Sequence, residues 1–309
     1  MGALNRLKYS ELYERAKPLI YINDSYLILL NASSLVIIIS LLFIIIKNKP
    51  QRLHVDMKLT CIVIISDFVS SLSTSTSALA NILNLGQGLD NPILCRLNAI
   101  ALGIGFSTSL ITIGVLSLER CLIIVYEKEL APKYYYLIII VESSILLGFL
   151  IFCAATEGFH IMPTSEYCLL DISTSSGLST SIAFFIIGGT SLVTVLICYT
   201  KICVFRRSQS LEAQLELGLN PLKVKREVNI TILKSLTLIA ASLLTNGPYV
   251  AIQVFTWIDP KFLTPLSDTI SCICITSSAF INTIILLKLK PEFLNLLKQL
   301  WGFKCENDD

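Results

Sequence analysis

Charge is scarce in this chain. Only 15% of its 309 residues are charged and 54% are hydrophobic, whereas soluble globular proteins carry about a quarter charged residues. The mean hydropathy is +0.73. So few polar side chains cannot cover so much apolar surface in water, so the composition excludes an ordinary soluble domain and predicts a membrane protein.

The chain also lacks the residues of several kinds of site. Its net charge is only +2, and no segment is basic with interleaved aromatic residues, which excludes a nucleic-acid-binding surface. Its two histidines, His54 and His160, fall in predicted loops. No H-E-x-x-H, G-x-S-x-G or metal-spaced cluster of cysteine and histidine occurs, so the sequence favours a protein that is not an enzyme.

Two further features are missing. Residues 1–23 lack the apolar core of a cleavable signal peptide, so we expect the first membrane helix to direct insertion. The sequence has no internal repeat and no pair of helices interrupted by Gly or Pro, which inverted-repeat transporters usually show. We therefore expect a single membrane domain.

What the chain does contain is a series of seven apolar runs, each near the roughly 20 residues that a membrane helix needs. They lie at 26–46, 59–83, 96–125, 134–155, 179–204, 230–257 and 264–287. We predict an all-α membrane protein with a seven-transmembrane helix bundle. The second run is the weakest because it is rich in Ser and Thr, whose hydroxyls suit a helix packed among other helices.

Lysine and arginine predict the orientation of the bundle. One side collects eighteen of them, in 47–58, 120–133, 201–235 and the C-terminal tail, and the other side collects six. Because cytoplasmic loops carry the excess, we predict a multi-pass plasma-membrane protein with its N-terminus outside and its C-terminus in the cytoplasm. The sequon at Asn23 would then lie outside, available for glycosylation.

The ends of the chain complete this organisation. Within 290–303, five apolar residues share one helical face, which predicts a short amphipathic helix on the membrane surface: Phe293, Leu296, Leu297, Leu300 and Trp301. The predicted divisions are an extracellular N-terminus (1–25), the seven-helix bundle (26–287), and the amphipathic helix with a cytoplasmic tail (288–309).

Ten cysteines are present. Cys95 and Cys168 both face the oxidising exterior, which predicts a disulfide that pins the 156–178 loop over the mouth of the bundle. Cys305 follows the amphipathic helix and is either palmitoylated or a free thiol. The others lie in apolar runs and are interpreted as small buried hydrophobes: Cys61, Cys121, Cys153, Cys198, Cys203, Cys272 and Cys274.

Among the ionisable residues inside the predicted spans, three positions matter most: Asp67, the pair Glu119 and Arg120, and Glu142. Each costs about a few kcal/mol in lipid unless it is paired or hydrated, so intramembrane charges are functional candidates. The apolar run continues past Arg120 as "CLIIV", so Arg120 lies within the helix and must face protein or a wet cleft. Glu142 has no partner that the sequence identifies.

Several spacings agree with one known pattern. "LER" ends at Arg120, and Cys95 stands 25 residues before it. Four further segments follow in order: "VIISD" (63–67), "ICYTKI" (197–202), "TNGPY" (245–249) and "NTIILLKLKPEF" (282–293). Together these six features resemble the rhodopsin-like G-protein-coupled receptors, and the resemblance covers nearly the whole chain.

The chain departs from that family at several positions. Cys121 stands where Tyr is usual after the arginine, and Asn246 replaces the usual Trp of helix 6. In helix 7, Thr283 replaces Pro and Leu286 replaces Tyr. Helices 4 and 5 lack their usual Trp and Pro. The resemblance therefore implies a divergent member with an altered switch.

The resemblance implies a signalling mechanism. Glu119 would hold Arg120 at rest, and its release would let Arg120 reach Tyr199 or a partner. Pro248 would provide a hinge in helix 6 because it removes a helical hydrogen bond. A ligand bound outside would favour the state that admits a heterotrimeric G protein inside. Asn282 belongs to the same switch.

Five basic residues also lie on the inner side. They line the proposed G-protein site, or they only set the membrane orientation and contact lipid headgroups: Arg206, Arg207, Lys223, Lys225 and Arg226.

Four polar residues occupy positions that form a sodium pocket in the family: Asp67, Ser109, Ser278 and Asn282. Their oxygen atoms suit a hard cation, and the alternative is a hydrated polar cluster without an ion. No other cofactor is expected. Thr276 stands in the place of the retinal lysine, so the resemblance implies no retinal attachment lysine.

The resemblance also places a ligand pocket near the outer side, between helices 3, 5, 6 and 7. Leu102 stands where amine receptors carry an Asp, so a cationic amine would find no counter-ion there. The expected wall suits a small neutral or lipid-like ligand, although about half of its residues would be core packing: Asn98, Leu102, Phe106, Phe184, Tyr249, Gln253, Cys272 and Thr276.

A transporter or channel that uses Asp67 and Glu142 as an ion or proton relay is the alternative function. The missing repeat and the six ordered matches disfavour it. The sequence does not identify the ligand, the class of G protein or the oligomeric state.

Overall fold

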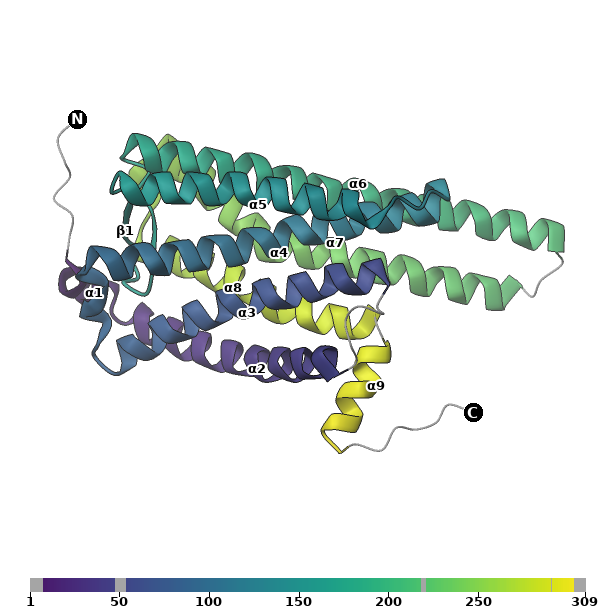
Figure 1. The fold of residues 1–309 in the computed structure, drawn as a ribbon, viewed down its shortest axis with the longest axis horizontal. Coiled ribbons are helices and arrows are strands. Elements are labelled where there is room, and N and C mark those ends of the chain that lie inside the picture. Colours follow the sequence, from purple (N-terminus) through teal and green to yellow (C-terminus); the bar gives the residue numbers. More distant parts are fainter. Residues whose placement is uncertain (1–7, 48–53, 218–220, 290, 303–309) are drawn as a thin grey trace.

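Seven long helices form the body of the protein and lie side by side along its length (Figure 1). The computed structural model describes residues 8–47, 54–217, 221–289 and 291–302. The long helices are α2 (Leu19–Lys47), α3 (Val55–Ile82), α4 (Pro92–Tyr126), α5 (Pro132–Ala155), α6 (Ser175–Leu217), α7 (Pro221–Ile258) and α8 (Pro265–Leu289). The predicted seven-helix bundle is confirmed.

The starts of the helices follow from local sequence. Pro92 and Pro132 stand in the first turns of α4 and α5, where the missing N–H of proline costs nothing and its fixed φ suits a helix. The Asn91 side chain accepts a hydrogen bond from the Ile93 N–H at 2.9 Å and caps α4. At the other end of α4, Glu127 takes a left-handed conformation, which terminates the helix.

Six of the described helices are long and apolar enough to cross a membrane. The seventh long helix, α3, does not reach the same hydropathy but belongs to the same bundle. Ser and Thr lower its hydropathy, as the sequence predicts. Their hydroxyls bond the backbone of their own helix: Thr74 Oγ1 donates to the Ser70 carbonyl at 3.0 Å, and Ser75 Oγ donates to the Ser71 carbonyl at 2.6 Å. These groups are therefore satisfied without water.

Glycines let α4 approach its neighbours closely. A Cβ atom at Gly105 would lie 2.9 Å from the backbone nitrogen of Ser70 in α3, and one at Gly114 would lie 3.2 Å from the Cα of Ser191 in α6. Membrane helices use small residues in this way because lipid provides little drive for helices to associate, and close packing must replace it. The helix that carries Glu119 and Arg120 is thus held in the middle of the bundle.

Short elements close one end of the bundle, called here the hairpin end. It carries α1 (Tyr9–Ala16), the 3₁₀ turns η2 (Gly86–Asp90) and η3 (Pro260–Phe262), and a hairpin of β1 (Phe159–Ile161) and β2 (Cys168–Leu170) (Figure 1). Tyr9 anchors α1 there, because its N–H donates to Asp90 Oδ1 at 2.9 Å and its hydroxyl to Asn81 Oδ1 at 3.1 Å. The sequence analysis did not identify α1.

The opposite end, called here the Arg120 end, carries the last helix, α9 (Pro291–Leu300), which lies across the bundle (Figure 1). Phe293 and Leu297 are buried against apolar residues of α2 and α8, and Trp301 Nε1 donates to Ser40 Oγ at 3.3 Å. The predicted amphipathic helix is present. Cys305 lies outside the described residues.

Two helices differ from the predicted boundaries. We expected spans at 179–204 and 230–257 joined by a loop with its own helix, but α6 continues to Leu217 and α7 begins at Pro221. Both helices extend beyond the rest of the bundle at the Arg120 end (Figure 1). The first span also begins earlier than predicted, because α2 starts at Leu19 rather than near residue 26.

Candidate functional site

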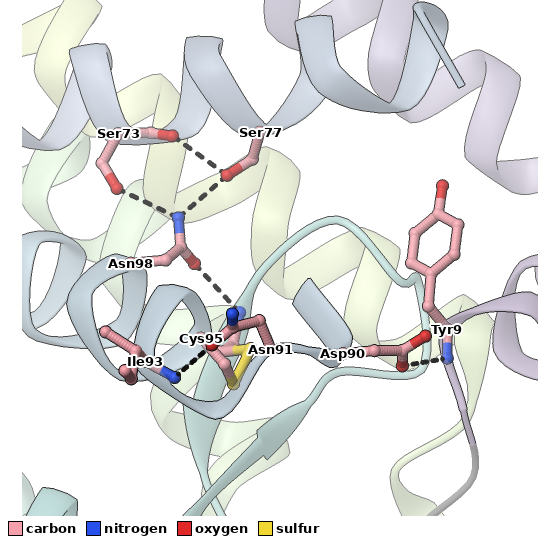
Figure 2. Close-up of a disulfide and its surroundings, with 9 residues drawn as sticks. Tyr9, Ser73, Ser77, Asp90, Asn91, Ile93, Cys95 and Asn98 are labelled. Carbon is pink, nitrogen blue, oxygen red and sulfur yellow. Dashed lines mark hydrogen bonds between the residues drawn. A yellow bond between two sulfur atoms is a disulfide. The ribbon is translucent and has the colours of Figure 1, made fainter. Parts of the chain in front are cut away.

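A disulfide fixes the hairpin to the bundle. Cys95 at the start of α4 is bonded to Cys168 in β2, with their Cα atoms 5.3 Å apart (Figure 2). The predicted bond is therefore present. Among the described residues, the seven cysteines of the apolar runs are free, and they are buried or half-buried.

Asn98 reinforces this attachment. Its Oδ1 accepts from the Cys168 N–H at 3.0 Å, and its Nδ2 donates to Ser77 Oγ at 2.8 Å and to Ser73 Oγ at 3.2 Å (Figure 2). We predicted Asn98 as part of the ligand-pocket wall. Both of its polar atoms are occupied in joining α3, α4 and β2, and its part in a ligand pocket stays a prediction.

The turn between β1 and β2 enters the mouth of the bundle. Its residues 162–167, called here the lid, are almost completely buried. Met162 and Tyr167 pack against Leu27 of α2, Leu102 of α4 and Cys272 of α8. The space between the helices is thus closed at the hairpin end.

Two small cavities lie beneath the lid, each of about 40 Å³. Seven of the eight predicted wall residues line at least one of them. Six line the first cavity, next to the lid, and Gln253 lines only the second, beside α6. Asn98 is not among the described residues lining either. Those of the first are Leu102, Phe106, Phe184, Tyr249, Cys272 and Thr276. Ligand pockets for small molecules usually measure about 300–1,000 Å³, so neither cavity admits one without a rearrangement.

A larger cavity of about 500 Å³ lies on the outer side of the lid. Leu12 of α1, Phe159 of β1 and Leu263 line part of it. Arg96 and Glu157 also border it, with Arg96 Nη2 3.4 Å from Glu157 Oε1. The room for a ligand is therefore in front of the lid rather than behind it.

A polar contact that the sequence analysis missed joins α6 to α7. Ser181 Oγ accepts hydrogen bonds from Gln253 Nε2 at 2.9 Å and from Trp257 Nε1 at 3.1 Å. Phe185 adds an edge contact to the Trp257 ring, with centroids 5.0 Å apart. Ser181 lies among many serines and threonines in α6, so nothing in its local sequence distinguishes it.

Tyr249 connects the cavities to the expected hinge. Its ring meets the Phe106 ring of α4 edge-on at 6.3 Å, and it follows Pro248, which lies inside α7. Pro248 cannot donate a backbone hydrogen bond, so α7 is weakened at this point. A group that displaces Tyr249 would therefore act directly on the weakest turn of α7.

The centre of the bundle contains the predicted sodium-pocket residues. Asp67 is buried, and its carboxyl interacts with the side chains of Ser109 and Asn282. A cavity of about 10 Å³, bordered by Asp67 and Ser278, lies beside it. The Ser71 hydroxyl, also buried there, has no hydrogen-bond partner among the described residues. This set of oxygen atoms fits a small hard cation.

At the Arg120 end, Arg120 of α4 contacts α6. Its Nη1 donates to the Tyr199 hydroxyl at 3.4 Å. Both residues border a cavity of about 50 Å³ that α7 closes with Leu238, Ala241 and Ser242. Glu119 is buried, and its pairing with Arg120 stays a prediction. The arginine thus has the tyrosine contact that we expected after its release, while α7 still covers it.

Glu142 lies elsewhere. It is half-buried in the middle of α5, whose outward face is apolar. The cavity beside Asp67 does not include it among its described lining residues. The described lining of that cavity therefore does not join Glu142 to Asp67.

Comparison with known proteins identifies the fold. No protein-family model matches the sequence, and no curated protein matches it. The crystal structure of squid rhodopsin matches with a TM-score of 0.71 at 16% identity, and the match covers 99% of this chain and 90% of that one. The chain has the rhodopsin fold. With the six long apolar helices, this fold makes it a multi-pass membrane protein surrounded by lipid.

The sequence resemblance implies no retinal attachment lysine, and this stays a prediction. Within α8, the lysine is Lys288, which lies in the last turn at the Arg120 end. Thr276, at the expected retinal position, donates its hydroxyl to the Cys272 carbonyl at 2.6 Å. A threonine has no amine, so this residue cannot form a Schiff base.

Proposed function

We propose that this protein is a G-protein-coupled receptor that responds to an external ligand at its hairpin end and acts on a heterotrimeric G protein at its Arg120 end. The observation that carries the proposal is the Arg120 to Tyr199 contact beneath α7, in a chain with the rhodopsin fold. Lipid does not tolerate an unpaired guanidinium, so a site that shelters one and can uncover it supports a switch.

The proposed switch is a change in the packing of α7. In the described state, Leu238 and Ala241 close the cavity over Arg120, and Ser181 holds the other end of α7 through Gln253 and Trp257. Rotation about the Pro248 turn would separate the inner halves of α6 and α7. Ligand binding would shift the population toward that open state.

The ligand is proposed to be small and neutral or lipid-like. Phe106, Phe184 and Leu102 give the inner cavities apolar walls with a few polar groups. Because these cavities are small, binding requires movement of the lid or of α7. Asp67, with Ser109, Ser278 and Asn282, would hold a sodium ion that favours the closed packing.

The orientation follows from the distribution of lysine and arginine. We place the hairpin end outside the cell and the Arg120 end in the cytoplasm of a plasma-membrane receptor. Arg206 and Arg226 on α6 and α7 support this placement, because the two helices extend beyond the bundle at that end. A disulfide at the hairpin end also suits an oxidising compartment.

The decisive experiment replaces Arg120 with Gln. We expect basal nucleotide exchange, measured with a panel of co-expressed G proteins, to fall at least about tenfold, since one lost charge-assisted contact of about 1.4 kcal/mol has that effect. Arg96→Gln is the matched control, because Arg96 is also an arginine of α4 but lies at the hairpin end. Unchanged exchange in Arg120→Gln, at equal surface expression, would contradict the proposal.

A further inference from the structure

Three carboxyl groups meet where the lid enters the bundle. Asp24 comes from α2, Glu166 from the lid and Asp268 from α8, and their exposed fractions are 3%, 1% and 0%. Tyr9, Asn81 and Cys272 contribute from α1, α3 and α8. The sequence analysis did not identify this group, since none of the three belongs to a recognised motif.

Asp268 is fully satisfied as a carboxylate. Its Oδ1 accepts from the Tyr167 hydroxyl at 2.6 Å, and its Oδ2 accepts from the Thr164 N–H at 2.9 Å and the Thr164 hydroxyl at 2.7 Å. Three donors to one carboxylate stabilise its charge. Asp268 therefore binds the lid to α8 as an anion.

Asp24 and Glu166 are arranged differently. Their side chains hydrogen-bond to each other, and two carboxyl groups can do so only if one of them carries a proton. Asn23 Nδ2 also donates to Glu166 Oε2, and Asn81 Nδ2 lies 3.4 Å from Asp24 Oδ1. Glu166 Oε1 and Asn23 Oδ1 are buried acceptors without a hydrogen-bond partner among the described residues. Acceptors thus outnumber donors at this point.

No cation compensates the pair. None of the ion pairs formed between described residues involves Asp24, Glu166 or Asp268. The titratable groups that face the pair are phenols, thiols and carboxyls: Tyr9 and Tyr13 from α1, Asp268 and Cys272 from α8, and Tyr167 from the lid. From α3, the neutral Asn81 contacts Asp24. From α4, the apolar Leu102 packs in the neighbouring cluster. A second negative charge here would be unpaired and buried.

We propose that Asp24 and Glu166 hold one proton between them, and that this proton keeps the lid in the mouth of the bundle. With the proton present, the pair is a hydrogen bond between the lid and α2. Without it, the pair is two anions, beside a third at Asp268, and their repulsion drives residues 162–167 outward. The mouth of the receptor therefore opens more easily as the external pH rises.

The direction follows from linkage. Burial, followed by the nearby charges of Asp24 and Asp268, raises the pKa of Glu166 well above its ordinary value of 4.5. When the lid opens, water restores that ordinary value. The closed state therefore binds more protons than the open state above pH 4.5, and the open population grows up to about tenfold per pH unit until the raised pKa is passed.

Cys272 is a native reporter of this opening. Its thiol lies 3.7 Å from Glu166 Oε2, beneath the lid, and is buried. We would treat the purified full-length protein with a bulky, charged thiol reagent at about pH 5 to 8 and measure the modification rate of Cys272 by peptide mass spectrometry. Detergent exposes both ends of the protein, so the result depends neither on membrane orientation nor on a G protein.

The test compares the protein with Glu166→Gln, whose amide keeps a donor to Asp24 at every pH. The ratio of the two rates cancels the intrinsic pH dependence of the thiol. We expect the ratio to rise with pH by up to about tenfold per unit. Glu157→Gln is the matched control, because Glu157 is a glutamate of the same loop with a 70% exposed side chain, and it should retain the unsubstituted profile.

A ratio that stays constant with pH overturns the proposal, as does a Glu157→Gln variant that abolishes the pH dependence equally. If Glu166→Gln does not fold, Asp24→Asn makes the same comparison from α2, with the same two outcomes. Unchanged nucleotide exchange in the Arg120 experiment would leave this result intact, so the two proposals fail separately.

Discussion

At the scale of single residues, the contact between Arg120 and Tyr199 joins α4 to α6 beneath α7, the helix that would have to move for a partner to enter. The bond is long, at 3.4 Å, and both side chains border a cavity, so it is weak enough to break and re-form. Cys121 and Cys198, which flank the two residues, are buried in the same apolar cluster. The arginine therefore lies beside a packed apolar cluster.

Tyr199→Phe removes the hydroxyl from this contact and leaves the ring in place. We expect basal G-protein nucleotide exchange to fall about fivefold, because one hydrogen bond of about 1 kcal/mol is lost from the state that frees the arginine. Tyr126→Phe is the matched control, since the Tyr126 hydroxyl accepts from Lys201 Nζ at 2.7 Å at the same end. Equal effects of the two substitutions would show that the Arg120 contact has no special role.

The candidate site was only partly predictable at this scale. Arg120 and Tyr199 were found because their positions follow recognisable local motifs. Asn98 was placed in the pocket wall from its position alone, but its bonds to Cys168, Ser73 and Ser77 come from other elements. Glu166 and Asn23 meet across 143 residues of sequence, and no local pattern predicts such a pairing.

Asn23 shows most clearly why local sequence does not predict contacts between distant residues. The sequon predicts an exposed residue, since polar residues before an apolar run indicate a surface segment. In the structure Asn23 is completely buried in α2 and donates to Glu166. The folded chain therefore does not present this amide for glycosylation.

At the scale of helices, the sequence predicted the centre of each long helix but not where each helix begins and ends. Long apolar runs locate six of the seven clearly, because lipid requires them, whereas α3 is the weakest run because of its Ser and Thr residues. The extension of α6 to Leu217 was missed because residues 205–217 are polar. No Gly or Pro interrupts the chain between Gly189 and Gly218, so nothing stops the helix once it leaves the apolar region.

The close approach of α3 and α4 depends on Gly105. We expect Gly105→Leu to destabilise the fold by about 1–3 kcal/mol, because overpacking a tight contact forces the backbones apart, and to lower the melting temperature of the purified protein. Gly148→Leu in α5 is the matched control, since no other heavy atom lies within 4 Å of the Cβ it would add. If both variants melt alike, α3 and α4 are not held by this contact.

At the scale of the whole molecule, buried polar groups form layers along the bundle. The lid and its three carboxyl groups lie at one end, Asp67 in the centre and Arg120 at the other end. Small cavities separate these layers. Since α7 or α8 borders each layer, a change at the lid has a continuous path of packed helices to the Arg120 end.

The function of these layers depends on the direction in which the bundle crosses the membrane. Glu157, on the hairpin side, and Glu129, on the Arg120 side, have similarly exposed side chains, at 70% and 74%. A cysteine placed at either position would therefore be equally reactive if it could be reached. We expect a membrane-impermeant maleimide to label Glu157→Cys on intact cells and to label Glu129→Cys only after permeabilisation. Wild-type protein, with its own thiols, gives the background for both, and the opposite pattern would place Arg120 outside the cell, where it cannot meet a G protein.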